Sequence, residues 1–292
     1  PKDFVLWKPS TADQPGWDSP WGRGRPGWHI ECSAMVKKHL GDTIDIHGGG
    51  SDLTFPHHEN EAAQSRCANE SKDYVRYWLH NGMLTLGSEK MSKSVGNVRT
   101  VHGLAEQHSG EVLRYALLSG QYRSNLSWSD ELLAQARASL DSLYQTLRDN
   151  SADTPITSLD FADASAALDP ENVVNALADD LNTPQALAGL HELANQLRKA
   201  SSPQAAEQAR NRLLAGGWLL GFLHQQPEEY FTTSTSATEA SISNADIDAI
   251  IQARQDARKN GDYQLADDLR NELAAAGIEL EDSREGTRWR RL

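Results

Sequence analysis

The spacing of apolar and polar residues divides the chain into a first part of short mixed elements and a second part of longer helices. Up to about residue 100, short apolar runs alternate with turns that are rich in glycine and proline. This alternation is typical of α/β folds, whose sites lie at the ends of the strands. We expect a strand at 3–8, a loop-dominated stretch at 7–27, a helix at 30–40, a strand at 43–47, a helix at 56–68, a helix end at 74–80 and a strand at 82–86. In the helix at 30–40 we expect Ala34, Met35 and Leu40 to face inward.

From about residue 101 the apolar residues recur at helical spacing, which predicts a helical bundle. The expected helices include 112–118, 131–147, 171–180, 184–200 and 203–223. Residues 226–243 are polar and rich in Ser and Thr, as is typical of a linker. The last unit has predicted helices at 244–259 and 263–276, Gly277 as a C-cap, and a strand at 278–282.

The net charge of the chain is negative, and most of it lies in the second part. The formal net charge is -13, with 14 Lys and Arg against 16 Asp and Glu in residues 1–135, and 14 against 25 in residues 136–292. Such an acidic half repels a polyanion, so contact with nucleic acid depends on local patches. One candidate is the end of the chain, where Arg284, Arg288, Arg290 and Arg291 surround Trp289. Arginine binds phosphate and tryptophan offers a stacking face, but a tail that only improves solubility fits the composition equally well.

Cysteine content and hydropathy indicate the compartment. The chain has two cysteines, no secretory signal, and no apolar run near the roughly 18 residues of a membrane span. We therefore expect a reducing, cytoplasmic location and no membrane partner. The chain begins at Pro1 and not at methionine, and its first residues already read as an interior strand. This leads us to expect a fragment or a processed piece of a longer protein.

Three residues in the first part have the chemistry of a metal site. Cys32, His57 and Glu61 offer a thiolate, an imidazole and a carboxylate, which are ligand types that Zn²⁺ accepts. His57 and Glu61 are four residues apart, so on a helix both point from the same face. Three protein ligands with an open fourth position are typical of catalytic zinc, and an open position suits a thiol. The alternative is a solvated helix face beside a buried cysteine that packs as a small apolar residue.

A second motif offers positive charge in a loop after a strand. Residues 89–94 place Lys90 and Lys93 beside two serines. Two ammonium groups with hydroxyl donors can hold a triphosphate and offset the charge that develops when pyrophosphate leaves. A Lys/Ser loop by itself is also common on solvated surfaces. The string Lys-Met-Ser-Lys-Ser, however, matches the signature of class I aminoacyl-tRNA synthetases.

With this signature in view, the rest of the chain resembles cysteinyl-tRNA synthetases from end to end. The resemblance rests on residues 27–35, 45–53, 55–61, 122–124, 179–184 and 289–291. It implies that Cys32, His57 and Glu61 bind one zinc ion per subunit, and that Lys90 and Lys93 are catalytic. Lys93 is expected to contact ATP, together with the turn that contains His47, Gly48 and Gly49. Trp28 is expected to line the cysteine pocket, and Asp52 to contact substrate; for His47 and Asp52 a structural hydrogen bond is the alternative.

The resemblance also implies a domain order. We expect an α/β region that is the second half of a Rossmann-like nucleotide-binding fold at 1–100, a stem-contact and connecting region at 101–135, a tRNA-binding helical bundle at 136–225, the linker at 226–243, and a small α+β anticodon-side module at 244–292. The family's His-x-Gly-His turn and a further zinc-ligating cysteine have no counterpart in this sequence. Cys67, the other cysteine, is expected to be a core residue and not a substitute ligand.

The activity implied is a ligase that uses ATP with Mg²⁺ to form cysteinyl-adenylate and transfers cysteine to tRNA(Cys). Zinc would select the thiolate of cysteine against serine, since zinc stabilises deprotonated sulfur. Without the second ATP-binding signature, we expect these residues alone to be inactive and zinc binding to be weakened, with the absent N-terminal segment as a potential partner. We expect a monomer. The alternatives are a non-catalytic tRNA-binding module and a ligase that joins cysteine to an amino sugar by the same adenylate chemistry.

Overall fold

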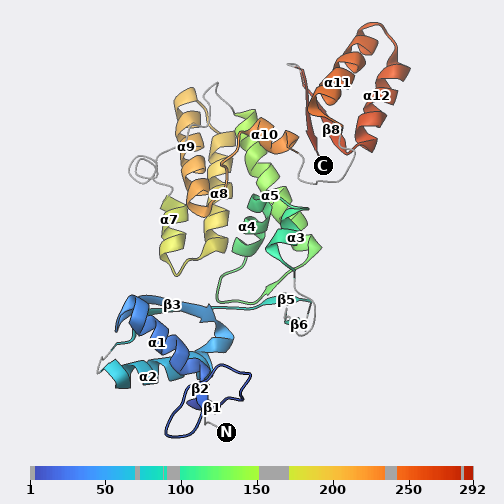
Figure 1. Cartoon of the computed structure of the whole chain (residues 1–292). Helices are drawn as coiled ribbons and strands as arrows, with labels where there is room; N and C mark the ends of the chain where they lie inside the picture. The colour runs from blue at the N-terminus through green and yellow to red at the C-terminus, as the bar shows by residue number, and fades with distance from the viewer. Residues whose placement is uncertain are drawn as a thin grey trace. The chain divides into compact units, whose positions relative to one another are not determined.

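The chain divides into two compact units, which are described separately here (Figure 1). The computed structural model describes residues 4–69, 73–87, 89–90, 99–150, 171–233, 242–283 and 286–291. Unit 1 comprises Pro1–Met91 and Tyr122–Trp128, and unit 2 comprises Ser92–Gln121 and Ser129–Leu292. The second unit therefore begins in the sequence before the first unit is complete.

The centre of unit 1 is a strand–helix–strand arrangement. Strands β3 (Ile44–Gly50) and β4 (Val75–Asn81) pair in parallel, with Ile44 opposite Val75 and Gly50 opposite Asn81. The connection between them contains a short 3₁₀ turn η1 (Ser51–Leu53), a π-helical turn η2 (Thr54–His58) and helix α2 (Glu59–Asn69). Helix α1 (Trp28–Leu40) precedes β3. The small core contains Ile44, Ala62, Tyr74 and Val75, with Val36 and Trp78 packed against it.

Two smaller sheets complete unit 1. Strands β1 (Trp7–Pro9) and β2 (Gly24–Pro26) pair antiparallel, so the stretch predicted as loop contains a strand. Strand β5 (Leu84–Leu86) lies between β6 (Glu89–Lys90), which is antiparallel to it, and β7 (Leu126–Ser127), which is parallel to it. Residues 74–80, expected as a helix end, belong mostly to strand β4.

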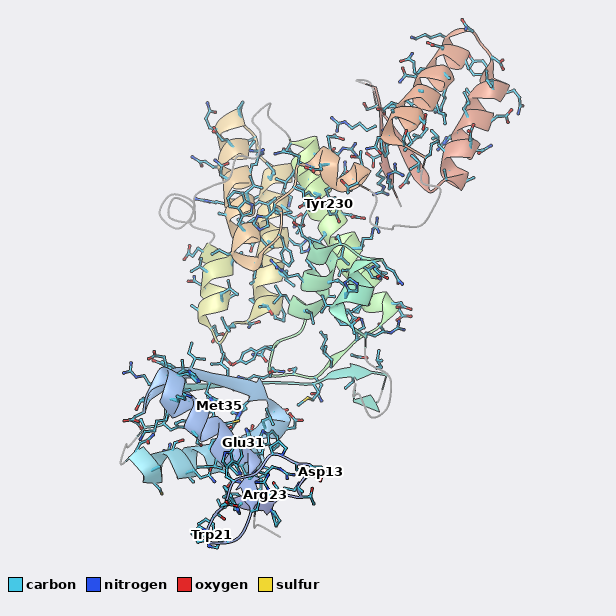
Figure 2. The ribbon with its side chains drawn as sticks, viewed as in Figure 1. Asp13, Trp21, Arg23, Glu31, Met35 and Tyr230 are labelled. Carbon is cyan, nitrogen blue, oxygen red and sulfur yellow. The ribbon has the colours of Figure 1, made fainter. Side chains whose placement is uncertain are left out.

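Helix α1 buries a polar face, which contradicts the predicted orientation. His29 and Ser33 are its buried residues, whereas Met35 and Leu40 are 54% and 66% exposed and Ala34 is also exposed. Figure 2 labels Met35 on this helix. The prediction placed apolar side chains inward, but the two buried residues make polar contacts: His29 with the ring of His57, and Ser33 with the carbonyl oxygen of Glu61. Cys67 is exposed as well, so its prediction as a core residue was wrong.

Unit 2 is almost entirely helical, and most of its helices begin at a side-chain cap. Ser109, Ser129, Asn182 and Ser202 each accept a hydrogen bond from the first turn of the following helix, which satisfies a backbone N–H that has no helical partner. The helices are α3 (Val101–Ala105), α4 (Gly110–Leu118), α5 (Asp130–Asp149), α7 (Glu171–Ala178), α8 (Thr183–Arg198), α9 (Pro203–Leu220) and α10 (Pro227–Thr232). Their core contains fully buried leucines, among them Leu140, Leu143, Leu190, Leu197 and Leu213. The mixed α/β fold followed by a helical bundle is therefore confirmed.

The C-terminal part of unit 2 consists of α11 (Asn244–Lys259), α12 (Tyr263–Ala275) and an antiparallel pair, β8 (Ile278–Asp282) and β9 (Thr287–Arg291). Its core contains Ile247, Ile251, Leu273, Ile278 and Trp289. Helix α10 lies inside the segment predicted as a linker. Its Phe231 is buried and its Tyr230 stacks on Tyr144 of α5 at 3.8 Å between ring centroids, so this part of the segment is ordered structure.

Candidate metal centre

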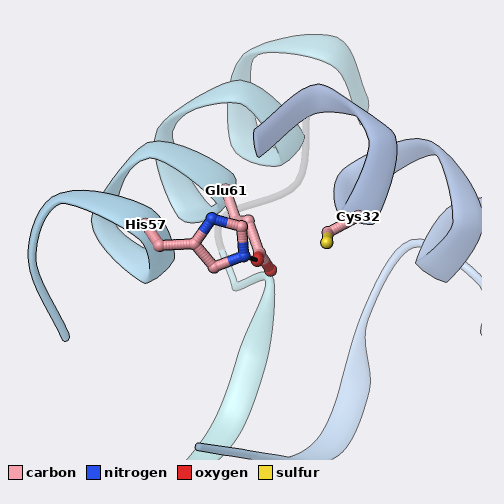
Figure 3. Close-up of side chains that lie close together, drawn as sticks. All are labelled: Cys32, His57 and Glu61. Atoms are coloured by element: carbon pink, nitrogen blue, oxygen red, sulfur yellow. Dashed lines mark ion pairs between the residues drawn. The ribbon is translucent and has the colours of Figure 1, made fainter. Parts of the chain in front are cut away.

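The three predicted metal ligands lie together in unit 1 (Figure 3). His57 is in the turn that leads into α2, and Glu61 follows one helical turn later, so both side chains leave the same face. Cys32 comes from α1. One ligand atom from each of the three residues lies within 4.8 Å of the others. Ligand atoms around a tetrahedral zinc ion are roughly 3.3–3.8 Å apart, given metal–ligand distances of about 2.0–2.3 Å, so small side-chain adjustments would suffice.

The electrostatics of this cluster favour a cation. Glu61 is 1% exposed, and burial raises the pKa of its carboxyl. Burial also lowers the pKa of His57, so its imidazole is neutral near pH 7. Glu61 Oε1 is buried without a hydrogen bond among the described residues, although His57 Nε2 lies directly beside it. A buried carboxylate without a fixed positive charge is costly, and a bound dication would offset that cost.

The ionisation of the Cys32 thiol also depends on a bound cation. Burial, and after it the charge of Glu61, raise the pKa of Cys32. The thiol is therefore protonated at neutral pH unless a metal ion stabilises the thiolate. A soft thiolate, an imidazole and a carboxylate together fit zinc better than magnesium or calcium, which prefer oxygen ligands.

The His57 ring is held in place by His29, which sequence reasoning missed, and by Trp28, which it named. Its Nδ1 lies 2.8 Å from Nδ1 of His29, which leaves Nε2 directed at Glu61. The Trp28 ring stacks on the His57 ring at 4.0 Å and an interplanar angle of 25°. In metal sites the second nitrogen of a ligating histidine commonly has a hydrogen-bond partner, which fixes the tautomer and the ring orientation. His29 is that partner for His57 Nδ1. The structure thus places Trp28, the expected pocket residue, against an expected ligand.

Glu61 also belongs to a second, overlapping group. Its Oε2 lies 3.4 Å from His47 Nε2 and accepts a hydrogen bond of 3.2 Å from the Tyr74 hydroxyl. His47, His58 and Glu61 likewise place ligand atoms within 4.8 Å of one another. His58 Nδ1 lies 2.8 Å from His80 Nε2. Sequence reasoning missed His29, His58 and His80, although the adjacent pairs Trp28–His29 and His57–His58 were a usable signal.

The glycine-rich end of β3 has a structural explanation for at least one glycine. A Cβ atom at Gly49 would lie 2.9 Å from His58 Cε1, so a side chain there would displace the imidazole. His47 is in contact with the cluster through Glu61, and Asp52 lies in η1 directly after the glycines. Contacts of His47, Gly48 and Gly49 with ATP and of Asp52 with substrate stay predictions.

The lysine motif lies largely outside the described residues. Lys90 is the last residue of β6, but its side chain is not described, and Lys93 falls in the undescribed stretch 91–98. Their expected roles therefore stay predictions.

The basic end of the chain is largely occupied by contacts within the protein. Trp289 is buried in the core of the C-terminal part and its Nε1 donates to Asp248 Oδ1 at 3.0 Å, so a stacking role for its ring does not fit the structure. Arg290 Nε donates to Glu279 at 2.6 Å, and Arg288 lies 3.6 Å from Asp149. Contact of Arg288, Arg290 and Arg291 with tRNA stays a prediction.

Comparison with known proteins identifies the fold and then the family. The model of the tRNA synthetases class I (C) catalytic domain matches residues 1–138, a DALR domain matches 172–224, and a cysteinyl-tRNA ligase anticodon binding domain matches 244–290. The structure of a LeuRS–tRNA–LeuAMS complex from Agrobacterium radiobacter K84 aligns with a TM-score of 0.50 at 15% identity, over 73% of this chain and 35% of that one. The fold is therefore that of a class I aminoacyl-tRNA synthetase.

Two curated relatives, the cysteine--tRNA ligases of Saccharophagus degradans and Parvibaculum lavamentivorans, are each 53% identical over 290 residues, or 99% of this chain. The chain belongs to the cysteinyl-tRNA synthetase family. It spans 61% and 60% of the length of these two relatives.

Proposed function

We propose that this chain carries the cysteine-binding part of a ligase that activates cysteine with ATP and transfers it to tRNA(Cys). The observation that supports this most is the cluster of Cys32, His57 and Glu61, with the Trp28 ring stacked on His57. The three residues would hold a zinc ion. Bound zinc would supply an electrophilic centre with a preference for thiolate sulfur over a hydroxyl.

The protein's own residues prepare this site in three ways. Glu61 supplies the negative charge that favours a cation, and Tyr74 fixes the second carboxylate oxygen. His29 holds the His57 ring so that Nε2 faces Glu61. Trp28, which is 57% exposed, offers an apolar face on which a small substrate side chain can pack.

This arrangement addresses the selection of cysteine against serine. An apolar pocket distinguishes such near-isosteres by only about 10²-fold. A metal-based selector exceeds this limit because a hydroxyl is both a weaker ligand and a much weaker acid than a thiol.

The test is calorimetric titration of the zinc-loaded 292-residue chain with cysteine and with serine. We expect cysteine to bind and serine to bind more than about 10²-fold more weakly. His57→Ala and Glu61→Gln should abolish cysteine binding, whereas Cys67→Ser, a matched change at the exposed thiol, should leave it intact. Equal binding of cysteine and serine would contradict the proposal.

The remaining parts of the activity have weaker support and are also proposals. Lys90 and Lys93 would contact ATP with its Mg²⁺, and the C-terminal part would contact the tRNA. The match of residues 244–290 to an anticodon binding domain argues against a ligase that uses an amino sugar as acceptor. A cytoplasmic location would keep the two free thiols reduced. No helix among the described residues is long and apolar enough to cross a membrane.

A further inference from the structure

Unit 2 contains a small cavity whose lining includes one residue of the predicted tRNA-binding set, Arg291. It has a volume of about 80 Å³ and lies where α4 and α5 meet the segment around α10 and strand β9. Its polar lining includes His108, Arg137, Asp141, Gln225, Tyr230 and Arg291. Tyr230 is labelled in Figure 2. The volume suits a single small group and not a nucleoside or an amino acid with its side chain.

Two guanidinium groups at this cavity have no carboxylate partner among the described residues. The hydrogen bond that Arg137 makes is a long one, 3.5 Å from Nη2 to the Arg291 carbonyl oxygen. Arg291 donates to the Thr232 and Ile242 carbonyl oxygens and to Asn244 Oδ1, all of which are neutral. By contrast, Arg148, Arg254 and Arg290 in the same unit each have a carboxylate within 2.8 Å.

The one carboxylate in the lining is already engaged. Asp141 Oδ1 accepts a hydrogen bond of 2.8 Å from the Tyr230 hydroxyl. Burial, and after it the Asp141 charge, raise the pKa of Tyr230, so the phenol stays neutral and remains a donor. The cavity therefore has two positive charges against one partly satisfied negative charge, before any contribution from His108. The cavity also lies at the N-terminal end of α4, where the helix dipole favours an anion.

We propose that this cavity binds one phosphate group of the RNA backbone, with Arg137 as the principal contact. The proposal rests on the proposed function, because it assumes that tRNA is the substrate. It also answers the difficulty raised by the charge of residues 136–292, which carry 14 Lys and Arg against 25 Asp and Glu. An acidic surface binds RNA through local sites that pair a phosphate with a guanidinium fork.

The test is binding of an unmodified tRNA(Cys) transcript to the full 292-residue chain as a function of salt concentration. We expect Arg137→Gln to weaken binding about tenfold at low salt and to lower the slope of log K against log salt by about one. Arg137→Lys should restore part of the loss, since it keeps the charge but not the planar fork. Asp141→Asn, which keeps an acceptor for Tyr230, should tighten binding roughly threefold.

Lys199→Gln is the matched control, because Lys199 is an exposed cation away from the cavity. A loss equal to that of Arg137→Gln in this control would show a general charge effect and overturn the proposal. Wild-type binding with an unchanged affinity and slope in Arg137→Gln would overturn it too, while leaving the proposed function intact. If the wild-type chain does not bind the transcript, the tRNA part of the proposed function fails together with this inference. Unchanged thermal unfolding of Arg137→Gln would establish that the variant is folded.

Discussion

Arg148 is expected to be the residue that contributes most to the attachment of α10 to the bundle. Its side chain is 2% exposed. Its Nε and Nη2 donate to the two oxygens of Glu228 at 2.8 and 2.7 Å, and longer bonds of 3.4 Å reach Glu281 Oε2 and the Trp289 carbonyl oxygen. The guanidinium also lies 5.1 Å from the centre of the Phe231 ring. One buried cation thus connects α5 with α10 and with the hairpin β8–β9.

The perturbation is Arg148→Met, which keeps the apolar stem and removes the charge. Hydrogen bonds to charged groups contribute about 1.5–3 kcal/mol each, but they are not additive. The carboxylates left behind are 60% and 33% exposed and regain water, so the loss stays below the about 3–5 kcal/mol of a charge left buried without a partner. The variant also no longer has to bury a charged guanidinium away from water, which offsets a further part of the loss of stability. We therefore expect a net loss of about 2 kcal/mol.

Hydrogen exchange measured by mass spectrometry on peptides spanning 227–233 is the suitable assay. A chain of two units does not unfold in one two-state transition, so a global unfolding energy would not isolate the effect. A six-residue helix such as α10 is not stable by itself, and its amide protection therefore reports its attachment. A loss of about 2 kcal/mol corresponds to exchange about 30-fold faster.

Arg288→Met is the control for this prediction. Arg288 pairs with Asp149 at 3.6 Å on the surface, and such a pair contributes about 0–1 kcal/mol. Exchange in α10 should change less than fivefold in this variant, and peptides of α8 should be unchanged in both. Unchanged exchange in α10 of Arg148→Met would refute the reasoning.

Three further predictions concern other parts of the chain. Gly221→Ala should lower the stability of unit 2 by about 1–2 kcal/mol, because Gly221 has a φ of 77° and a Cβ atom would lie 1.7 Å from Arg114 Nη1. The control is Gly110→Ala, since a Cβ atom at Gly110 would have open space around it. Equal thermal unfolding of the two variants would contradict this prediction. The Arg254 hydrogen bonds hold the pKa of Asp282 well below its usual value, so they contribute stability that is present above about pH 4 and lost as the pH falls below it. Hydrogen exchange in residues 278–282 should therefore accelerate below about pH 4, and Asp282→Asn should remove that acid dependence. With zinc bound, a thiol reagent should modify exposed Cys67 quickly and Cys32 very slowly. A chelator should speed the reaction of Cys32 while leaving it slower than that of Cys67, because burial raises the pKa of the free Cys32 thiol. Equal protection of Cys32 with and without zinc would contradict its role as a ligand.

The sequence predicted the parts of the site that depend on local spacing and ligand chemistry. His57 and Glu61 lie one turn apart on a helical segment, as their four-residue separation predicted, and Cys32 comes from the preceding helix. His47 was named from the sequence but its neighbours His58 and His80 were not, because the three come from separate elements. His47 lies on β3, His58 precedes α2 and His80 lies on β4, and only the parallel pairing of these strands brings them together.

The misassigned elements have three physical causes. Helix α1 was oriented by Ala34, Met35 and Leu40, but its buried residues are the polar His29 and Ser33, and only Val36 among its apolar side chains packs on the core of unit 1. The tail around Trp289 was interpreted from composition, whereas strand alternation in β9 buries the Trp289 side chain and leaves both neighbouring arginines less buried. Helix α10 was missed because its stability depends on contacts such as those of Arg148 and Tyr144, which no local pattern reveals.

The central claim is that Cys32, His57 and Glu61 form one zinc centre that takes the sulfur of the substrate. X-ray absorption at the zinc edge, on the chain loaded with less than one equivalent of zinc, tests this most directly. The account predicts a sulfur ligand in the wild-type chain that is absent in Cys32→Ser, and one additional sulfur when cysteine is added but not when serine is added. A zinc environment without sulfur in the wild-type chain, or one that cysteine leaves unchanged, would contradict it.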